Sequence, residues 1–164
     1  MVIESLESFK KQYYEKIAKG EDVAADIKEI NESNISDTDK QEIRAEGFVH
    51  AFNEMKGSKD SQEFMKHYSN VQKMSEGGIP SRVENPKLNT QLEYANNVTQ
   101  SFNERYMPDD TNNIGKFAEV IEQKQKLMDE QEATVLKFES VTQQKKNAPE
   151  IISTKQKGGK KCQN

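Results

Sequence analysis

The chain has 164 residues, enough for one ordinary domain or for two small helical units. Hydrophobic residues make up 32% of it and Trp is absent, so we expect a thin core, elongated helices, or a core completed by a partner. The 24 basic and 28 acidic residues give a net charge of -4, which argues against specific nucleic-acid binding because that binding needs a basic face.

Neither a secretion signal nor a membrane span is predicted. The N-terminus reaches Glu4 before any apolar run can form, and no stretch approaches the roughly 18 to 20 apolar residues of a transmembrane helix. The single cysteine, Cys162, cannot form an internal disulfide, which fits a reducing compartment. We therefore expect a cytoplasmic protein, while translocation into a host or another cell by a route without a signal peptide stays open.

Two helices are predicted near the N-terminus. Apolar residues recur at three- and four-residue steps over 3–19, and Gly20 follows at a position where glycine can adopt the left-handed cap conformation. A second, shorter helix is marked by apolar residues over 23–30. It ends in a polar Asn- and Ser-rich cluster.

The next two helices are predicted to form a hairpin. Ser36 begins a run of hydroxyl and carboxylate side chains that can cap a helix over 37–56. Ser58 or Asp60 can cap a following helix over 59–75, which the glycine pair at positions 77 and 78 stops. Each of these helices carries its own apolar stripe.

The segment 77–87 is predicted to be a linker. It holds two glycines and two prolines, and a proline such as Pro86 disfavours helix both at its own position and at the residue before it. We therefore expect one helical domain over 1–146, divided at this linker into possible sub-units 1–76 and 88–146.

The C-terminal half is predicted to contain a fifth helix, the longest helix and a tail. The fifth helix starts at Leu88 and stops before Pro108, and the long amphipathic helix covers 113–146, with Pro149 expected to end it. The remainder, 147–164, is polar and Gly-rich, which predicts a flexible basic tail. The predicted fold is all-α, with about six helices and no strand.

The long helix has the most specific pattern in the chain. When it is read in sevens, one position is apolar throughout, and the position three residues later is apolar at its ends and polar in the middle. The first position is occupied by Ile114, Ile121, Met128 and Val135, the second by Phe117, Lys124, Gln131 and Phe138, and Val120, Leu127 and Val141 widen the stripe. The pattern predicts packing along another helix, with the interaction residues Ile114, Phe117, Ile121, Met128, Val135 and Phe138. The sequence leaves open whether the other helix belongs to this chain or to a partner.

Few residues could support catalysis or metal binding. The only two histidines are surrounded by carboxylates at four-residue spacing: Glu42, Glu46 and Glu54 around His50, and Glu63 before His67. This spacing can place two ligands on one metal ion. His50, however, is predicted on the face opposite the apolar stripe and His67 on the edge of its own stripe, so the two diverge. A solvated charged face explains these residues better, and no metal, cofactor or catalytic residue is predicted.

The sequence therefore predicts a non-catalytic helical protein–protein interaction module, of the adaptor, chaperone or effector kind, that docks a partner protein or a second copy. One alternative is a small helical enzyme or metal-binding protein that uses the Glu and His faces of 37–56 and 59–75. The other is a weak nucleic-acid or membrane binder that uses the tail. There, Lys155, Lys157, Lys160 and Lys161 could each contribute ~1 kcal/mol of weak contact at an anionic surface.

Overall fold

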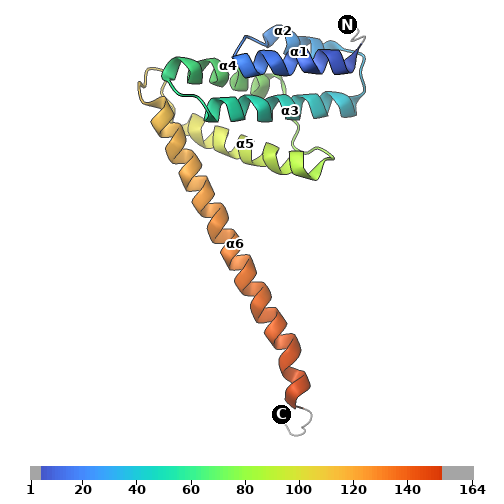
Figure 1. The fold of residues 1–164 in the computed structure, drawn as a ribbon, viewed down its shortest axis with the longest axis vertical. Helices are drawn as coiled ribbons and strands as arrows, with labels where there is room; N and C mark the ends of the chain where they lie inside the picture. The colour runs from blue at the N-terminus through green and yellow to red at the C-terminus, as the bar shows by residue number, and fades with distance from the viewer. Residues whose placement is uncertain (1–4, 153–164) are drawn as a thin grey trace. The chain divides into compact units, whose positions relative to one another are not determined.

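The computed structural model describes the backbone of residues 5–152 and the side chains of residues 5–137. Over this range the fold is all-α and has no strand, as the sequence predicted (Figure 1). The helices are α1 (Leu6–Lys19), α2 (Ala24–Glu32), α3 (Asp37–Lys56), α4 (Ser61–Gly77), α5 (Pro86–Arg105) and α6 (Asn113–Ile152).

Side-chain caps fix where α3 and α4 begin. The Ser36 hydroxyl accepts a hydrogen bond from the Asp39 amide at 3.1 Å. The Asp60 carboxylate accepts one from the Glu63 amide at 2.8 Å, so Asp60, rather than Ser58, caps α4. Both caps satisfy amides that have no partner within their own helix.

The start of α5 differs from the prediction because Pro86 lies inside the helix. It occupies the first helical position, where a missing N–H group leaves nothing unpaired and the fixed φ angle suits the helix. Asn85 caps this end by accepting hydrogen bonds from the amides of Lys87 and Leu88, at 3.0 and 3.2 Å. The helix therefore starts two positions earlier than the predicted Leu88.

The end of α6 also differs from the prediction. The helix continues past Pro149 to Ile152, so the expectation that residues 147–149 would end it was wrong. An internal proline removes one backbone hydrogen bond, and a long helix can absorb this loss by bending. Of the predicted flexible tail, 153–164 lies outside the described residues.

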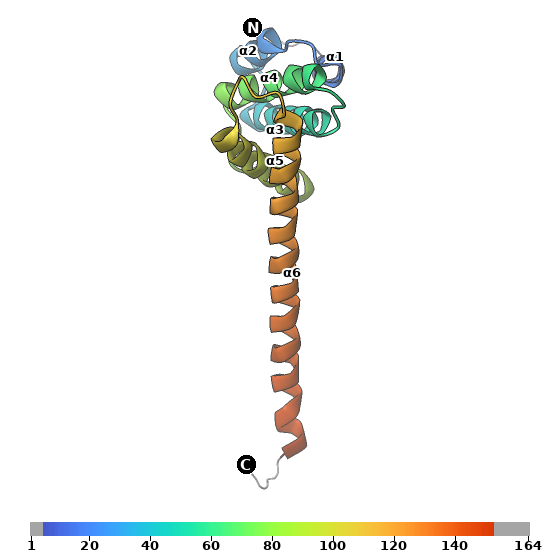
Figure 2. The same ribbon diagram turned by 90° about the vertical axis from the view of Figure 1, so that its left-hand side faces the viewer.

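α3 is the central helix of the bundle. It packs against α1, α2, α4 and α5, and Figures 1 and 2 show it lying between α1 and α5. The contact between α3 and α4 forms the predicted hairpin. The predicted stripe, however, covered only one side of α3, whereas the structure buries residues on several sides because neighbours surround the helix. The buried residues are Ile43, Ala45, Gly47, Phe48, Val49, Ala51, Phe52 and Met55.

The chain divides into two compact units, Met1–Ile121 and Glu122–Asn164. Among the described residues, every member of the hydrophobic core lies in the first unit. Because α5 packs against α3, the segment 77–87 joins two helices of that first unit. The division therefore falls within α6 and differs from the sub-unit boundary suggested by the glycines and prolines.

Candidate functional site

The first part of the α6 stripe belongs to the core of the first unit. Phe117 is only 3% exposed, and its ring centroid lies 5.4 Å from those of Phe64 and Phe102 and 5.8 Å from that of Phe52. Val120 is buried beside it. The predicted interaction residues in this part are Ile114, Phe117 and Ile121, and the two isoleucines are partly buried against the same core. This part of the stripe is therefore occupied by the chain's own helices.

The second part of the stripe is exposed. Among the described residues of the second unit, four large apolar side chains face solvent: Leu127 (51% exposed), Met128 (45%), Val135 (53%) and Leu136 (59%). Met128 and Val135 are predicted interaction residues. The side chain of Phe138, the last of that set, lies outside the described residues.

Helical geometry shows which of these exposed residues share a face. At about 100° per residue, an arc of about 100° contains Lys124, which is partly buried, and the exposed Leu127, Met128, Gln131 and Val135; we call these five residues the exposed stripe. Leu136 lies about 130° from the middle of that arc and belongs to another side of the helix. The exposed stripe thus combines three apolar residues with the two polar residues that the sevenfold pattern places in its middle.

The two histidines lie in different environments. His50 is exposed, and its ring centroid lies 4.7 Å from that of Tyr14. His67 was expected on the edge of its stripe but is only 3% exposed, and the end of α1 lies against its ring, since a Cβ atom at Gly20 would lie 3.2 Å from its Cε1 atom. Its Nδ1 atom has no hydrogen-bond partner among the described residues. Within those residues, no group of three or more His, Cys, Asp or Glu side chains is arranged to hold a metal ion.

The predicted solvated face of α3 is partly covered by α1. The Tyr14 hydroxyl donates a 2.9 Å hydrogen bond to the Glu46 carboxylate, and Lys10 lies 3.9 Å from the same carboxylate. Burial and the negative charge of Glu46 raise the pKa of Tyr14 above its usual range. The face that carries Glu46 and His50 therefore helps to attach α1 to α3.

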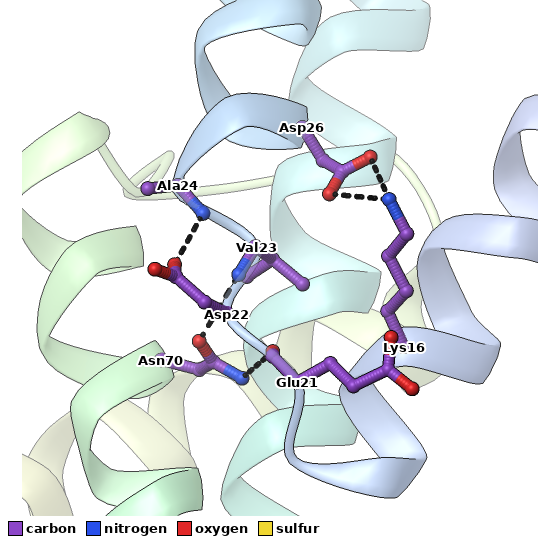
Figure 3. A network of polar contacts seen from close by, with 7 residues as sticks. All are labelled: Lys16, Glu21, Asp22, Val23, Ala24, Asp26 and Asn70. Carbon is purple, nitrogen blue, oxygen red and sulfur yellow. Dashed lines mark hydrogen bonds and ion pairs between the residues drawn. The ribbon is translucent and has the colours of Figure 1, made fainter.

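A second polar cluster surrounds the turn between α1 and α2 (Figure 3). Asn70, which α4 contributes, is 1% exposed; its amide group donates to the Glu21 carbonyl at 2.8 Å and accepts from the Val23 amide at 3.4 Å. On the other side of the turn, the Lys16 ammonium lies 3.2 Å from both carboxylate oxygens of Asp26. These polar groups are paired with one another, so the cluster holds the turn in place.

Sequence reasoning did not single out Asn70 or Asp26. Val23 precedes α2 without a side-chain cap, and that gap is the only local signal that its amide needs a partner from elsewhere. The partner comes from a helix 47 residues further along the chain. No local pattern could have identified it.

Among the described residues, no helix combines the length and the apolar composition needed to cross a bilayer. Neither a known protein family nor a curated protein nor a solved structure matches this chain.

Proposed function

We propose that this protein is a non-catalytic protein–protein interaction module that binds another helix through the exposed stripe of α6. The observation that carries the proposal is the change in solvent exposure along one face of α6. Its first residues, such as Phe117, are buried in the core, whereas Met128 and Val135 on the same face are about half exposed. Apolar residues with the same spacing thus pack into the core at the start of α6 and are exposed to solvent further along it.

The energetics of an isolated helix support this proposal. Helices draw most of their stability in proteins from packing an amphipathic face, and an unpacked helix in water is marginal. The described part of the second unit is helical throughout and exposes three apolar residues along one line. A helix docked on that line would bury these residues and stabilise the segment, as facing residues do in a coiled coil.

The use of the other polar residues supports the non-catalytic part of the proposal. Glu46 is engaged by Tyr14 and Lys10, and Asp26 by Lys16, so these carboxylates attach helices to one another. An adaptor, chaperone or effector that works in the cytoplasm is the class of protein that we propose. Such proteins act by presenting a surface.

Site-specific photo-crosslinking tests the proposed docking surface. A photoreactive phenylalanine analogue replaces Met128 in the full-length chain, and a matched variant carries it at Lys137, which lies about 130° from the middle of the exposed stripe. We expect a discrete crosslinked protein product, in cells of the native source, from position 128 and not from position 137. Absence of a product at both positions, or equal products from both, would show that the exposed stripe is not a docking surface.

A further inference from the structure

We propose that the occupant of the exposed stripe is a second copy of α6 in antiparallel orientation. This inference rests on the proposed function, because it identifies the partner of the same surface. It is carried by two charges, Lys124 and Glu132, and by the order of polar and apolar residues along the exposed stripe.

Lys124 and Glu132 have no opposite charge within reach on their own helix. Side chains interact along a helix at spacings of three and four residues. For Lys124 these positions hold two aliphatic residues on each side, and for Glu132 they hold Met128, Asp129, Val135 and Leu136. Lys126, in contrast, has Glu122 and Glu130 four residues before and after it. We call the line along which two paired helices face each other the seam. Lys124 lies on this seam and Glu132 lies beside it, so the opposite charge for each has to come from a partner.

A parallel pair of α6 helices would leave these charges unmatched. In a parallel pair each seam residue faces its own counterpart, so Lys124 would face a second Lys124 and Gln131 a second Gln131. Two ammonium groups would then face each other in one layer of the helix pair, where they are partly removed from water. Like charges in such a layer disfavour the pair.

An antiparallel pair places every polar seam residue opposite an apolar one. With the twofold axis between residues 129 and 130, Lys124 lies opposite Val135 of the second copy, and Met128 lies opposite Gln131. The twofold axis repeats both layers, as in any pairing of identical surfaces. In this register Leu127 is level with Glu132 of the second copy, and the two Leu127 residues lie on the same flank about 7.5 Å apart along the axis.

The same register provides a partner for each of the two isolated charges. Glu132 of the second copy lies three residues from Val135, or about 4.5 Å along the helix axis from the point that Lys124 faces. It is on the flank of the exposed stripe next to Met128, about 40° beyond it. The extended lysine side chain spans this offset, so the pair forms two symmetric Lys124–Glu132 ion pairs.

The contact between copies is expected to be weak. The overlap from 124 to 135 is about 18 Å long, so the buried area falls in the class of small, transient interfaces. Detecting the dimer therefore requires sedimentation measurements of the full-length chain at protein concentrations up to about 1 mM. We expect a reversible monomer–dimer equilibrium within this range.

Charge reversal tests the ion pairs directly. Lys124→Glu and Glu132→Lys should each weaken the dimer about tenfold or more, because each places like charges together. The double variant Lys124→Glu/Glu132→Lys should restore the affinity to within about threefold of the native chain. Lys137→Glu is the matched control: it makes the same charge change at a residue that also lacks an opposite charge three or four positions away, and it should leave the dimer unchanged.

Disulfide trapping tests the orientation. In a Cys162→Ser background, chains with Lys124→Cys are mixed with chains with Val135→Cys under mild oxidation. An antiparallel pair yields mainly the mixed disulfide, whereas a parallel pair yields the two homodisulfides because residues 124 and 135 are then about 16 Å apart along the axis. A preference for homodisulfides would overturn the antiparallel arrangement.

The remaining outcomes separate this inference from the proposed function. A chain that stays monomeric to about 1 mM, or single charge reversals that match the Lys137→Glu control, would overturn pairing between copies. If the photoreactive group at position 128 then crosslinks a different protein, the proposed docking function stands, and the partner is that protein rather than a second copy. If the double variant fails to restore the dimer that both single variants weaken, the Lys124–Glu132 register is wrong.

Discussion

Gly47 of α3 lies against the ring of Tyr13 of α1. A Cβ atom at this position would lie 2.9 Å from Cε2 and 3.0 Å from the hydroxyl oxygen of Tyr13, whose ring is buried. Overpacking typically lowers the free energy of unfolding by about 1–3 kcal/mol, and the higher helix propensity of alanine than of glycine offsets at most about 1 kcal/mol of this loss. Gly47→Ala should therefore lower the free energy of unfolding by about 1–2 kcal/mol in urea denaturation.

Gly57 provides the matched control for this prediction. A Cβ atom there would meet the carbonyl oxygen of Asn53 at 3.5 Å, which is ordinary van der Waals contact, and its φ angle of -87° suits any residue. Gly57→Ala should be neutral or slightly stabilising, because alanine restricts the unfolded chain. If the two variants unfolded at the same urea concentration, the close approach of Tyr13 would not constrain α3.

Asn70 should be the most sensitive residue of the polar cluster at the α1–α2 turn. Asn70→Ala leaves the buried Val23 amide and the partly buried Glu21 carbonyl without their partner. Each buried group that loses its hydrogen bond costs about 1–3 kcal/mol, so the loss of unfolding free energy should exceed 1 kcal/mol. Asn53→Ala, on the exposed side of α3, should change it by less than about 0.5 kcal/mol. Equal effects from both variants would contradict the assigned role.

Tyr68 links the stability of the fold to alkaline pH. Burial, followed by the nearby Tyr106, raises the pKa of Tyr68 from 10.0 to about 12. The folded chain thus holds this proton more tightly than the unfolded chain, so the stabilisation is complete below pH 10 and is lost as the pH rises from 10 to 12. Urea midpoints should fall over this window, and less steeply in Tyr68→Phe. Parallel pH profiles for the two proteins would show that Tyr68 does not titrate there.

At the scale of the helix, the two halves of the α6 stripe should respond differently to the same kind of change. Phe117→Ala removes a buried ring that contacts three others and should cost about 3–5 kcal/mol of unfolding free energy. Met128→Ala, on an exposed residue, should cost less than about 0.5 kcal/mol at a protein concentration low enough to keep the chain monomeric. Comparable losses in both variants would mean that Met128 is packed within the chain.

Helix ends governed by local chemistry were predictable, and burial governed by distant neighbours was not. Ser36 caps α3 as predicted, and Gly20 has the expected left-handed φ angle of 74° at the end of α1, because both depend on residues within one turn. His67 is buried where the end of α1, at Gly20, lies against its ring, a contact that the period of α4 does not encode. Pro86 was missed because proline both breaks helices and starts them.

The same distinction applies to the candidate site. The sevenfold period predicted one continuous stripe on α6, and this period continues unchanged across Ile121, where the core ends and the exposed part begins. Where a core ends depends on how far the other helices of that unit extend along α6. Three-dimensional packing decides this, so the sequence pattern alone could not separate Phe117 from Met128.

At the scale of the whole molecule, the first unit should fold without the second. Among the described residues, the buried core lies entirely within Met1–Ile121, so a chain that ends at residue 125 keeps all of it. Its thermal midpoint should stay within about 3 °C of that of the full-length chain, since little buried area is lost. The measurement is thermal unfolding followed by circular dichroism at low protein concentration.

A chain that ends at residue 112 is the control for this truncation, and it separates the two roles of α6. It lacks Phe117 and Val120, which are 3% and 1% exposed, and their loss opens the core against Phe52, Phe64 and Phe102. Its midpoint should fall by well over 10 °C, because large buried side chains are each worth several kcal/mol. If the chain that ends at residue 125 fell as far, the segment after Ile121 would be packing on the first unit. The exposed stripe would then be part of the chain's own core, and both the helix-docking function and the pairing of two copies would lose their basis.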